Sequence, residues 1–373
     1  MRVRIVSIGD MTDAMIAKWN AWAAPGGHLV SPYFRFEFTA AIAAVREDVR
    51  IAVIEDEDGD IAGFFPHHIA HDGVIRPVGA PMSDYQGVIA RPDTPMPMPA
   101  IVRAAGGSAI VFDNWYCPRG GSEAARRGRE GSVMVDLSHG SDAYFAERRA
   151  AHRDHFRKTA RRGRAAARDF GPVRVELADA DGLAFGQLAA WKRDQYRATG
   201  KLDVFGIDWV RQALDALRTT GSEDFGGLTA SLWFGDRLAA VEFGLVSGGV
   251  YHSWFPAYDP ELARYSPGLL LLHGLFEHAA DRGIARIDLG RGGHHYKKYY
   301  ASYEVPLDQG RVLVPGVAAA AIRSWELTER AARVMPDTLA ELPVRLRRRW
   351  AQVSAFQPHF APRIASFAGS VAR

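Results

Sequence analysis

The chain is poor in cysteine and has no long hydrophobic run. Cys117 is its single cysteine, so neither an intrachain disulfide framework nor a zinc site built from cysteines can form. No stretch approaches the roughly 20 apolar residues that a membrane-spanning helix needs. Residues 1–20 lack the apolar segment of a secretory signal peptide. These absences predict a cytoplasmic protein, with any membrane contact limited to the surface.

Net charge is small as well. The 373 residues carry +3 at pH 7, and 24% of them are charged, which is ordinary for a globular protein. The molecule as a whole is therefore not a polyanion binder by charge, and we expect no DNA partner. The length suggests two or three domains. Residue matching shows no internal repeat of about 20–50 residues.

Residues 1–140 predict an N-terminal α+β unit. Apolar spacing predicts strands at 3–8, 49–56, 61–69 and 109–112, and helices at 11–24, 34–45 and 101–105. Asp58-Gly59 lies between two of these strands and indicates a hairpin turn. Residues 76–99 are rich in proline and predict a long ordered loop.

Residues 141–171 are the most basic part of the chain and predict a connecting helix. Nine Lys or Arg side chains lie between Arg148 and Arg168, against one acidic residue, Asp154. They recur every three or four residues and so share one helix face. A solvated face is one interpretation. Because like charges at this spacing repel, the other is contact with an anionic partner: CoA phosphates, a sugar nucleotide, a polysaccharide, tRNA or a lipid surface.

Residues 172–310 predict a second α+β unit. Its predicted strands are 173–178, 225–234, 238–246, 249–255 and 284–289, and its predicted helices are 183–197, 208–219 and 266–276. Beyond Pro306 the pattern is helical, and residues 311–373 form a tail with a basic end. We expect this tail to pack on the body; the alternative is peripheral contact with a membrane surface.

The start of the helix at Ser266 is a candidate anion site. Serine is a preferred N-cap residue, and Pro267 fits the first helical position, where no N–H is needed. The N–H groups of Gly268, Leu269 and Leu270 would then be free to face an anion, helped by the helix dipole. A pyrophosphate suits such a site, and no Walker loop or dinucleotide fingerprint is present in the sequence to bind it elsewhere.

An ordered set of short motifs resembles one family. The motifs are Asp236-Arg237-Leu238-Ala239-Ala240, Tyr251-His252-Ser253-Trp254, Ala257-Tyr258-Asp259-Pro260, Ser266-Pro267-Gly268, Ile287-Asp288-Leu289-Gly290-Arg291-Gly292 and Tyr296-Lys297-Lys298. Together they resemble the GNAT-type acyltransferase domain of cellulose and exopolysaccharide biosynthesis (CelD-like) proteins, which is related to the Fem peptidoglycan aminoacyl transferases. The resemblance is strongest over residues 150–305 and weaker at 83–87.

This resemblance implies tandem GNAT-like halves, each a mixed sheet flanked by helices, with the basic helix at their boundary. It also implies an acyl-CoA co-substrate and no permanently bound cofactor. Typical GNAT enzymes hold the CoA pyrophosphate with a Gln/Arg-x-x-Gly-x-Gly/Ala loop. Tyr265-Ser266-Pro267-Gly268 occupies that place here, with one glycine. An aminoacyl-tRNA donor is therefore an alternative.

Two carboxylates, Glu242 and Asp288, lie inside apolar strands. Burial is costly for a carboxylate unless it is paired or used, and it raises the pKa toward the range that a general base needs. The alternative is a structural salt bridge to Arg237, Arg286 or Arg291. Carboxylates on two matching strands also occur in the related aminoacyl transferases, and this resemblance favours catalysis.

Basic residues crowd the glycine turn after the last predicted strand. We expect Lys297 or Lys298 to bind donor phosphates or the oxyanion; a solvated charge pair is the alternative. The predicted catalytic set is thus Glu242, Asp288 and Lys297, and the predicted cofactor-binding set is Ser266, Gly268, Leu269, Arg291 and Lys298. No metal is expected, because His294 and His295 are adjacent, point apart and lack a third ligand nearby.

Five residues are candidates for binding the acceptor: Asp84, Tyr85, Tyr251, Trp254 and Tyr258. Aromatic faces suit sugar rings, although core packing is the default for the last three. By resemblance, the loop of Asp84 and Tyr85 lines an acceptor cleft between the halves; an ordinary turn is the alternative. His252 is expected to be a core histidine.

The sequence therefore predicts an acyl-CoA-dependent N-acyltransferase. Its acceptor, by resemblance alone, is an amino sugar or related precursor in envelope or exopolysaccharide synthesis. One alternative is a Fem-like transferase that uses aminoacyl-tRNA. Another is a non-catalytic protein that senses an anionic nucleotide through the basic helix and tail.

Overall fold

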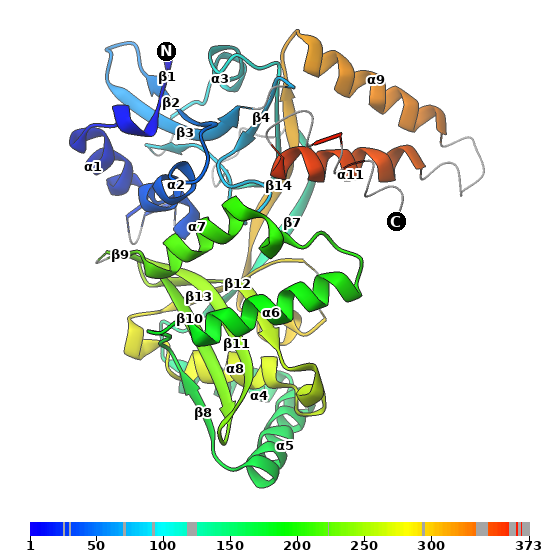
Figure 1. Cartoon of the computed structure of the whole chain (residues 1–373). Coiled ribbons are helices and arrows are strands. Elements are labelled where there is room, and N and C mark those ends of the chain that lie inside the picture. The colour runs from blue at the N-terminus through cyan, green and yellow to red at the C-terminus, as the bar shows by residue number, and fades with distance from the viewer. Residues whose placement is uncertain are drawn as a thin grey trace. The chain divides into compact units, whose positions relative to one another are not determined.

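The protein is described by a computed structural model (Figure 1), which covers residues 1–24, 27–29, 31–69, 72–91, 94–117, 125–222, 224–292, 295–332, 342–357, 363–364 and 367. The chain divides into two compact units. The first comprises Met1–Ala23, Ile42–Glu130 and Leu307–Arg373, and the second comprises Ala24–Ala41 and Gly131–Pro306. Within the described residues, no helix is both long enough and apolar enough to cross a bilayer.

The first unit is a mixed sheet with helices around it. Its strands follow the order β1 (Arg2–Val6), β2 (Val49–Glu55), β3 (Ile61–Ile69), β4 (Val74–Pro77), β6 (Ala109–Trp115) and β14 (Tyr303–Leu313), and β5 (Ile89–Ala90) pairs with β3. Its helices include α1 (Asp13–Trp22), α3 (Met98–Ala104), α9 (Val317–Ala332) and α11 (Leu342–Phe356). The predicted hairpin turn is confirmed: Gly59, with φ of 88°, lies between the antiparallel strands β2 and β3.

The helical prediction for the chain beyond Pro306 is wrong for its first residues. They form β14, which pairs with β6 through Asp308 and Trp115. The stretch alternates apolar and polar residues, as a half-buried strand does. The helical prediction followed instead from the alanine run further along the chain. The described tail packs on the first unit, as predicted: the Ala319 N–H donates to Ser108 Oγ, and Arg363 pairs with Asp72 at 3.0 Å.

The second unit is also a mixed sheet with helices on both faces. Its strands follow the order β7 (Arg126–Asp136, which enters this unit at Gly131), β13 (Arg286–Arg291), β12 (Val250–Tyr258), β11 (Arg237–Ser247), β10 (Phe225–Phe234) and β8 (Val173–Glu176), and β9 (Gly221–Ser222) pairs with β10. Its helices include α4 (Ser141–Ala151), α5 (Arg153–Phe170), α6 (Leu183–Ala198), α7 (Asp208–Thr219) and α8 (Pro267–Glu277). The bounds predicted for β10 and α7 match those of the structure.

The basic segment is two helices rather than one. The chain breaks between α4 and α5 at His152, whose φ of −134° lies outside the helical range. Its imidazole lies edge-on to the ring of Tyr299. Both helices belong to the second unit, whereas the residues from Leu307 onward belong to the first. The compact units therefore do not have the boundaries of the predicted connecting helix, residues 141–171, or of the predicted tail, residues 311–373.

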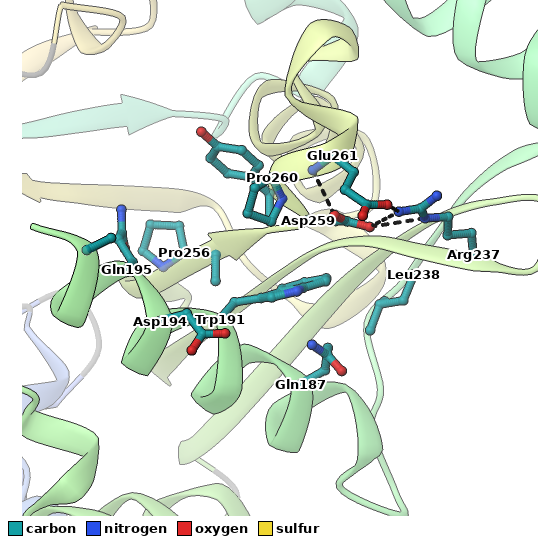
Figure 2. A pocket seen from close by; sticks show the side chains of 13 residues that line it. Gln187, Trp191, Asp194, Gln195, Arg237, Leu238, Pro256, Asp259, Pro260 and Glu261 are labelled. Carbon is teal, nitrogen blue, oxygen red and sulfur yellow. Dashed lines mark hydrogen bonds and ion pairs between the residues drawn. The ribbon is translucent and has the colours of Figure 1, made fainter.

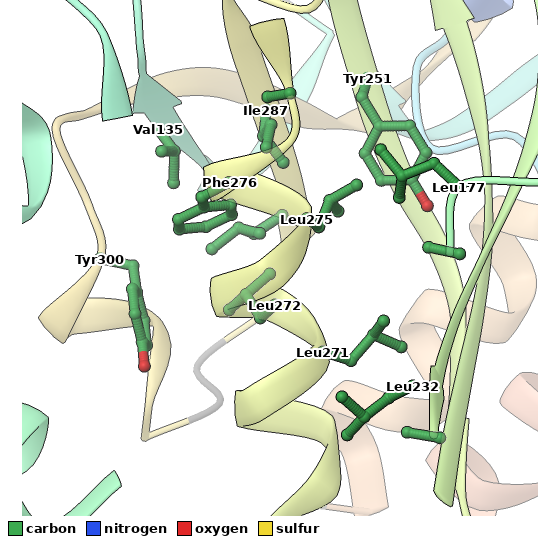
Figure 3. Packing of buried hydrophobic residues seen from close by; sticks show 14 of the residues in the cluster. Val135, Leu177, Leu232, Tyr251, Leu271, Leu272, Leu275, Phe276, Ile287 and Tyr300 are labelled. Atoms are coloured by element: carbon green, nitrogen blue, oxygen red, sulfur yellow. The ribbon is translucent and has the colours of Figure 1, made fainter. Parts of the chain in front are cut away.

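Helix α8 lies at the centre of the core of the second unit. Figure 1 shows α6 and α7 in front of the sheet and α8 behind it. The apolar side chains of α8 pack with residues of β10, β12 and β13, as Figure 3 shows for Leu271, Leu272, Leu275 and Phe276. Leu275 is fully buried, and truncation of such a leucine to alanine costs about 2–5 kcal/mol.

The two parallel strands of this sheet separate after a short paired segment. β12 pairs with β13 only from Val250 to His252, opposite Arg286 to Asp288. β12 then continues to Tyr258 beside β11, while β13 continues to Arg291 beside β7. A bulge in β12 near Phe255 accompanies this divergence. The sheet is thus split over the C-terminal ends of β12 and β13.

Candidate functional site

Glu242 is the buried acid of this split sheet. It lies on β11 with 3% of its surface exposed, opposite Pro256 of β12. Burial raises its pKa, against hydrogen bonds from Ser253 and Tyr251, and the latter phenol lies 3.4 Å from Oε1. Gly244 makes this contact possible, because a Cβ there would overlap the ring of Tyr251 and the carbonyl of His252.

Two further titratable groups lie within electrostatic range of Glu242. Lys192 of α6 has its pKa lowered to about 8 by burial, against the attraction of the Glu242 charge. Tyr296 has its pKa raised to about 12 by burial and then by the same charge. Tyr251 therefore contacts the carboxylate directly, while Lys192 and Tyr296 are close enough to feel its charge. Such a cluster is typical of a site that moves protons.

Sequence reasoning missed Lys192 and Tyr296. Lys192 follows Phe185 and Leu188 at helical spacing, so it occupies a position on the sheet-facing side of α6. A lysine at a core position of an amphipathic helix is the signal that could have found it. Tyr296 lies in the motif Tyr296-Lys297-Lys298, where nothing in the local sequence indicates that it lies near a buried acid.

Asp288 has polar partners other than arginine. Its Oδ1 accepts from Ser132 Oγ at 2.6 Å and from the Gly290 N–H at 2.8 Å, and its Oδ2 lies 3.5 Å from His252 Nδ1. Arg237, one of the suggested salt-bridge partners, pairs with acidic residues after β12 instead. These bonds fix the turn after β13 and suit a positioning role. Its predicted catalytic role stays a prediction.

His252 is a core histidine, as expected. It is fully buried, and its ring lies edge-on to Tyr33 at 5.0 Å. Trp254 also packs on Tyr33, at 5.4 Å, and on Phe243, at 6.3 Å. Trp254 is thus half-buried among aromatic rings, and its predicted contact with the acceptor stays a prediction.

The lysine pair after β13 divides into one buried and one exposed side chain. Lys297 is buried, and its Nζ donates to the carbonyls of Gly290 and Arg291 at 2.9 and 3.0 Å. Lys298 is exposed and lies 5.1 Å from the ring of Tyr299. Lys297 therefore holds the glycine turn in place. His294 lies outside the described residues, and among those described no group of His, Cys, Asp or Glu could hold a metal.

The predicted anion site at α8 needs correction. Ser266 precedes the helix with φ of 54° and makes no side-chain cap. Its carbonyl accepts from the N–H groups of Leu269 and Leu270 at 3.0 and 3.2 Å, so these two are not free. Within the described chain, the Gly268 N–H keeps no partner. The left-handed conformation of Ser266, which turns its carbonyl toward the helix, was not visible in the sequence.

Helix α5 brings positive charge to the same end of α8. Gly163 of α5 packs so closely that a Cβ there would lie 3.2 Å from Leu270 Cδ2. Arg162 and Arg164 flank this contact. Neither they nor Arg161 forms an ion pair with any described residue, and Arg161 and Arg164 are exposed. Arginines without an acidic partner thus flank, in the sequence, the α5 residue that packs on Leu270 of α8.

Asp84 and Tyr85 belong to the first unit. Tyr85 is buried, with its ring edge-on to Tyr116 at 5.8 Å. That their loop lines an acceptor cleft stays a prediction. In the second unit, Tyr251 is fully buried, and Tyr258, the last residue of β12, is 45% exposed.

Tyr258 lines a cavity of about 730 Å³ (Figure 2). One wall is α6, and the other is the end of β12 with the turn that follows it. The lining residues are Gln187, Trp191, Asp194, Gln195, Ala198, Arg237, Leu238, Pro256, Ala257, Tyr258, Asp259, Pro260 and Glu261. Sequence reasoning identified only Tyr258 among these as a site residue. The spacing of Gln187, Trp191 and Asp194 on one helix face is the signal that it passed over.

Comparison with known proteins agrees with this architecture. Residues 154–298 match the family described as the acetyltransferase (GNAT) domain. No curated protein matches the chain. Among solved structures, FemX is similar with a TM-score of 0.55 and 11% identity, over 87% of this chain and 99% of FemX.

Two other solved structures are similar with lower scores. One is the C-terminal domain of a putative lysylphosphatidylglycerol synthetase from Agrobacterium fabrum, with 14% identity and a TM-score of 0.46 over 78% of this chain and 91% of that one. The other is a tandem GNAT protein from the clavulanic acid biosynthesis pathway, with 9% identity and a TM-score of 0.45. The match covers 85% of this chain and 99% of that one.

The predicted fold class, a tandem GNAT-like α+β arrangement of mixed sheets flanked by helices, is confirmed by the likeness to FemX. The matched domain spans Glu242, Asp288, Lys297 and Lys298, and leaves out Asp84 and Tyr85. The match of residues 154–298 to the acetyltransferase (GNAT) domain likewise supports the prediction of an acyltransferase. The chain carries a GNAT acyltransferase domain over residues 154–298, in a fold similar to that of FemX.

Proposed function

We propose that the protein transfers an acyl group from acyl-CoA to the amine of an amino sugar or related precursor in envelope or exopolysaccharide synthesis. The observation that carries the proposal is the split between β12 and β13 beside Glu242. Among the described strands, none pairs with β12 on that side at Ala257 and Tyr258. An extended ligand with amide groups, such as a pantetheine arm, could add to this edge as a peptide adds to a sheet.

Glu242 is the proposed general base. The acceptor reaches the enzyme as an ammonium ion and must lose a proton before its nitrogen can attack the thioester carbon. The carboxylate takes that proton, the C–N bond forms, and the C–S bond of the tetrahedral intermediate then breaks. The nitrogen then loses its second proton, the leaving thiolate takes up one proton, and the proton held by the carboxylate passes to solvent. A pKa raised by burial brings the base closer to the pH at which the enzyme works.

The donor phosphates have a site of matching charge at α8. The Gly268 N–H lies in the first turn of the helix, where the dipole favours anions. Arg162 and Arg164 of α5 flank the residue that packs on this turn. Because Pro267 has no N–H and Leu269 is already bonded, arginine side chains would supply most of the attraction. Binding of the phosphates mainly by arginine side chains would differ from typical GNAT enzymes, in which a glycine-containing loop binds the pyrophosphate.

A thiol-release assay with acetyl-CoA and glucosamine tests the proposal. We expect native turnover, and a fall in kcat of about 10²–10⁴ in Glu242→Gln, since a general base contributes on that order. Glu277→Gln is the matched control, because Glu277 is exposed at the end of α8 in the same unit. No thiol release with any amino sugar, together with no heat of CoA binding, would contradict the proposal.

A second candidate donor is aminoacyl-tRNA, as the resemblance to Fem transferases implies. The observation that favours it is the exposed arginines of α5, of which Arg161 and Arg164 have no acidic partner among the described residues, whereas Arg157 and Arg168 pair with Asp154 and Asp169. Binding of bulk tRNA should then weaken steeply with salt, with a smaller slope in an Arg161→Glu, Arg164→Glu variant. Acyl transfer from acetyl-CoA that is indifferent to tRNA would end this alternative.

A further inference from the structure

The cavity beside α6 carries acidic rather than basic charge. Asp194, Asp259 and Glu261 line it, against one cation, Arg237. Arg237 is already bound to two of the three acids, with Asp259 Oδ2 at 2.6 Å and Glu261 as its second partner. Asp194 lies on α6, apart from that cluster, and pairs with exposed Arg197. The lining residues therefore carry more acids than cations, although Arg197 and Lys192 next to them offset part of this charge; the excess of acids favours an ammonium ion over a phosphate.

The cavity also offers aromatic faces and polar groups with spare hydrogen-bonding capacity. Trp191 and Tyr258 contribute rings from opposite walls, as Figure 2 shows for the indole. Among the described residues, the indole N–H of Trp191 and the amide of Gln187 have no hydrogen-bond partner. Gln195 accepts a 3.4 Å bond from Lys192 and keeps its NH₂ group. Aromatic rings with amides at their edges are suited to a hydroxylated ring.

The position of the cavity connects it with the proposed base. Pro256 lines the cavity and is the cross-strand partner of Glu242. Lys192, which feels the charge of Glu242 and donates to Gln195 of the lining, follows Trp191 on α6. The volume, about 730 Å³, falls within the range of about 300–1,000 Å³ that small-molecule sites occupy. The cavity also adjoins the proposed phosphate site, because Tyr258 Cδ1 would lie 4.0 Å from a Cβ at Gly268 in the first turn of α8.

We propose that this cavity is the acceptor site and that it takes an amine-bearing saccharide. The sugar ring stacks on Trp191 or Tyr258, its hydroxyls bond to Gln187 and Gln195, and Asp194 attracts its ammonium group. This assignment rests on the proposed N-acyltransferase function. It adds the residues that select the acceptor and the reason that an anionic sugar is disfavoured.

Saturation-transfer NMR on the full chain with glucosamine as the probe tests the assignment without requiring turnover. Trp191→Leu should weaken glucosamine binding about tenfold, the loss expected from one aromatic stack. Trp233→Leu is the matched control, since Trp233 lies on β10 and carries Arg174 over its ring at 5.4 Å. Its glucosamine signal should stay at the native level. Glucose 6-phosphate should bind more weakly than glucosamine, and this preference should shrink in Asp194→Asn.

Kinetics separate this assignment from the proposed function. If turnover occurs, Trp191→Leu should raise KM for the amino sugar about tenfold and leave KM for acetyl-CoA within about twofold of native. Turnover with an unchanged acceptor KM in both Trp191→Leu and Tyr258→Leu would overturn the assignment and leave the function standing. Trp191-dependent glucosamine binding without any turnover would support the site and reject the transferase function. No binding of glucosamine to the native chain would overturn the site.

Discussion

Acid should destabilise the second unit through two partly buried imidazoles, those of His273 and His155. The hydroxyl of Tyr300 lies 2.7 Å from His273 Nε2 and 2.9 Å from His155 Nε2, and so joins α8 to α5. His273 packs between Phe145 and Phe156, at 5.2 and 5.5 Å. Burial lowers its pKa from 6.5 to about 3. Burial also lowers the pKa of His155.

The size of the effect follows from proton linkage. Below pH 6.5 the unfolded chain binds a proton at His273 that the folded chain does not take up until about pH 3. The free energy of unfolding is therefore highest near neutrality and falls as the pH is lowered through this window. For His273 alone, the two pKa values give a loss of about 2 kcal/mol between pH 7.5 and pH 5.

The assay is hydrogen exchange of peptides from α8 at pH 7.5 and pH 5, corrected for the intrinsic exchange rates. The free energy of protection of α8 in the native protein should fall on acidification. In His273→Phe this fall should be about 2 kcal/mol smaller, because phenylalanine cannot titrate. The carboxylates contribute equally to both proteins and cancel in the difference. Equal losses in the native protein and the variant would show that His273 takes up its proton in the folded state, and would refute the reasoning.

Three further predictions follow from the site. On acidification, turnover should fall with a midpoint above pH 4.5, because burial raises the pKa of Glu242 above that ordinary value. The pH–rate profile of thiol release measures this midpoint, and a value at or below 4.5 would contradict the prediction. Lys297→Met should lower the free energy of unfolding by about 1–3 kcal/mol, since the carbonyls of Gly290 and Arg291 lose their donor. Urea unfolding measures this change, and an unchanged midpoint would show that water replaces the ammonium group. Gly244→Ala should cost about 1–3 kcal/mol by overpacking, measured by thermal unfolding, and an unaltered Tm would mean that the ring of Tyr251 can move aside.

The sequence was informative where one physical signal dominated. Regular apolar spacing with polar ends predicted α7 and β10 with the bounds that the structure has. It failed at β14, where a run of alanine after the strand outweighed the alternation within it. It also missed the break at His152, because helical spacing continues across that residue. Local pattern thus predicts long uniform elements well and abrupt changes poorly.

For the site, the residue types were easier to predict than their partners. A carboxylate in an apolar strand was enough to single out Glu242 and Asp288, which are both buried. Whether such a group faces a proton donor or a backbone N–H depends on side chains from other elements, which one sequence does not place. Lys192 was overlooked because a lysine on a helix is usually solvated. The first turn of α8 was misjudged because a left-handed serine cannot be read from residue type.

Gly244 gives the site a marker that can be found without a structure. The phenol of Tyr251 lies across β11 only because residue 244 has hydrogen where other residues carry carbon. Acid and glycine are two positions apart on one strand, and the tyrosine follows at the start of the next. A glutamate, any residue and a glycine, then a tyrosine seven positions on, therefore form a compact signature of this proton-handling arrangement. Chains that keep the acid and replace the glycine would have to surround it differently, and we would expect them to use another base or another acceptor.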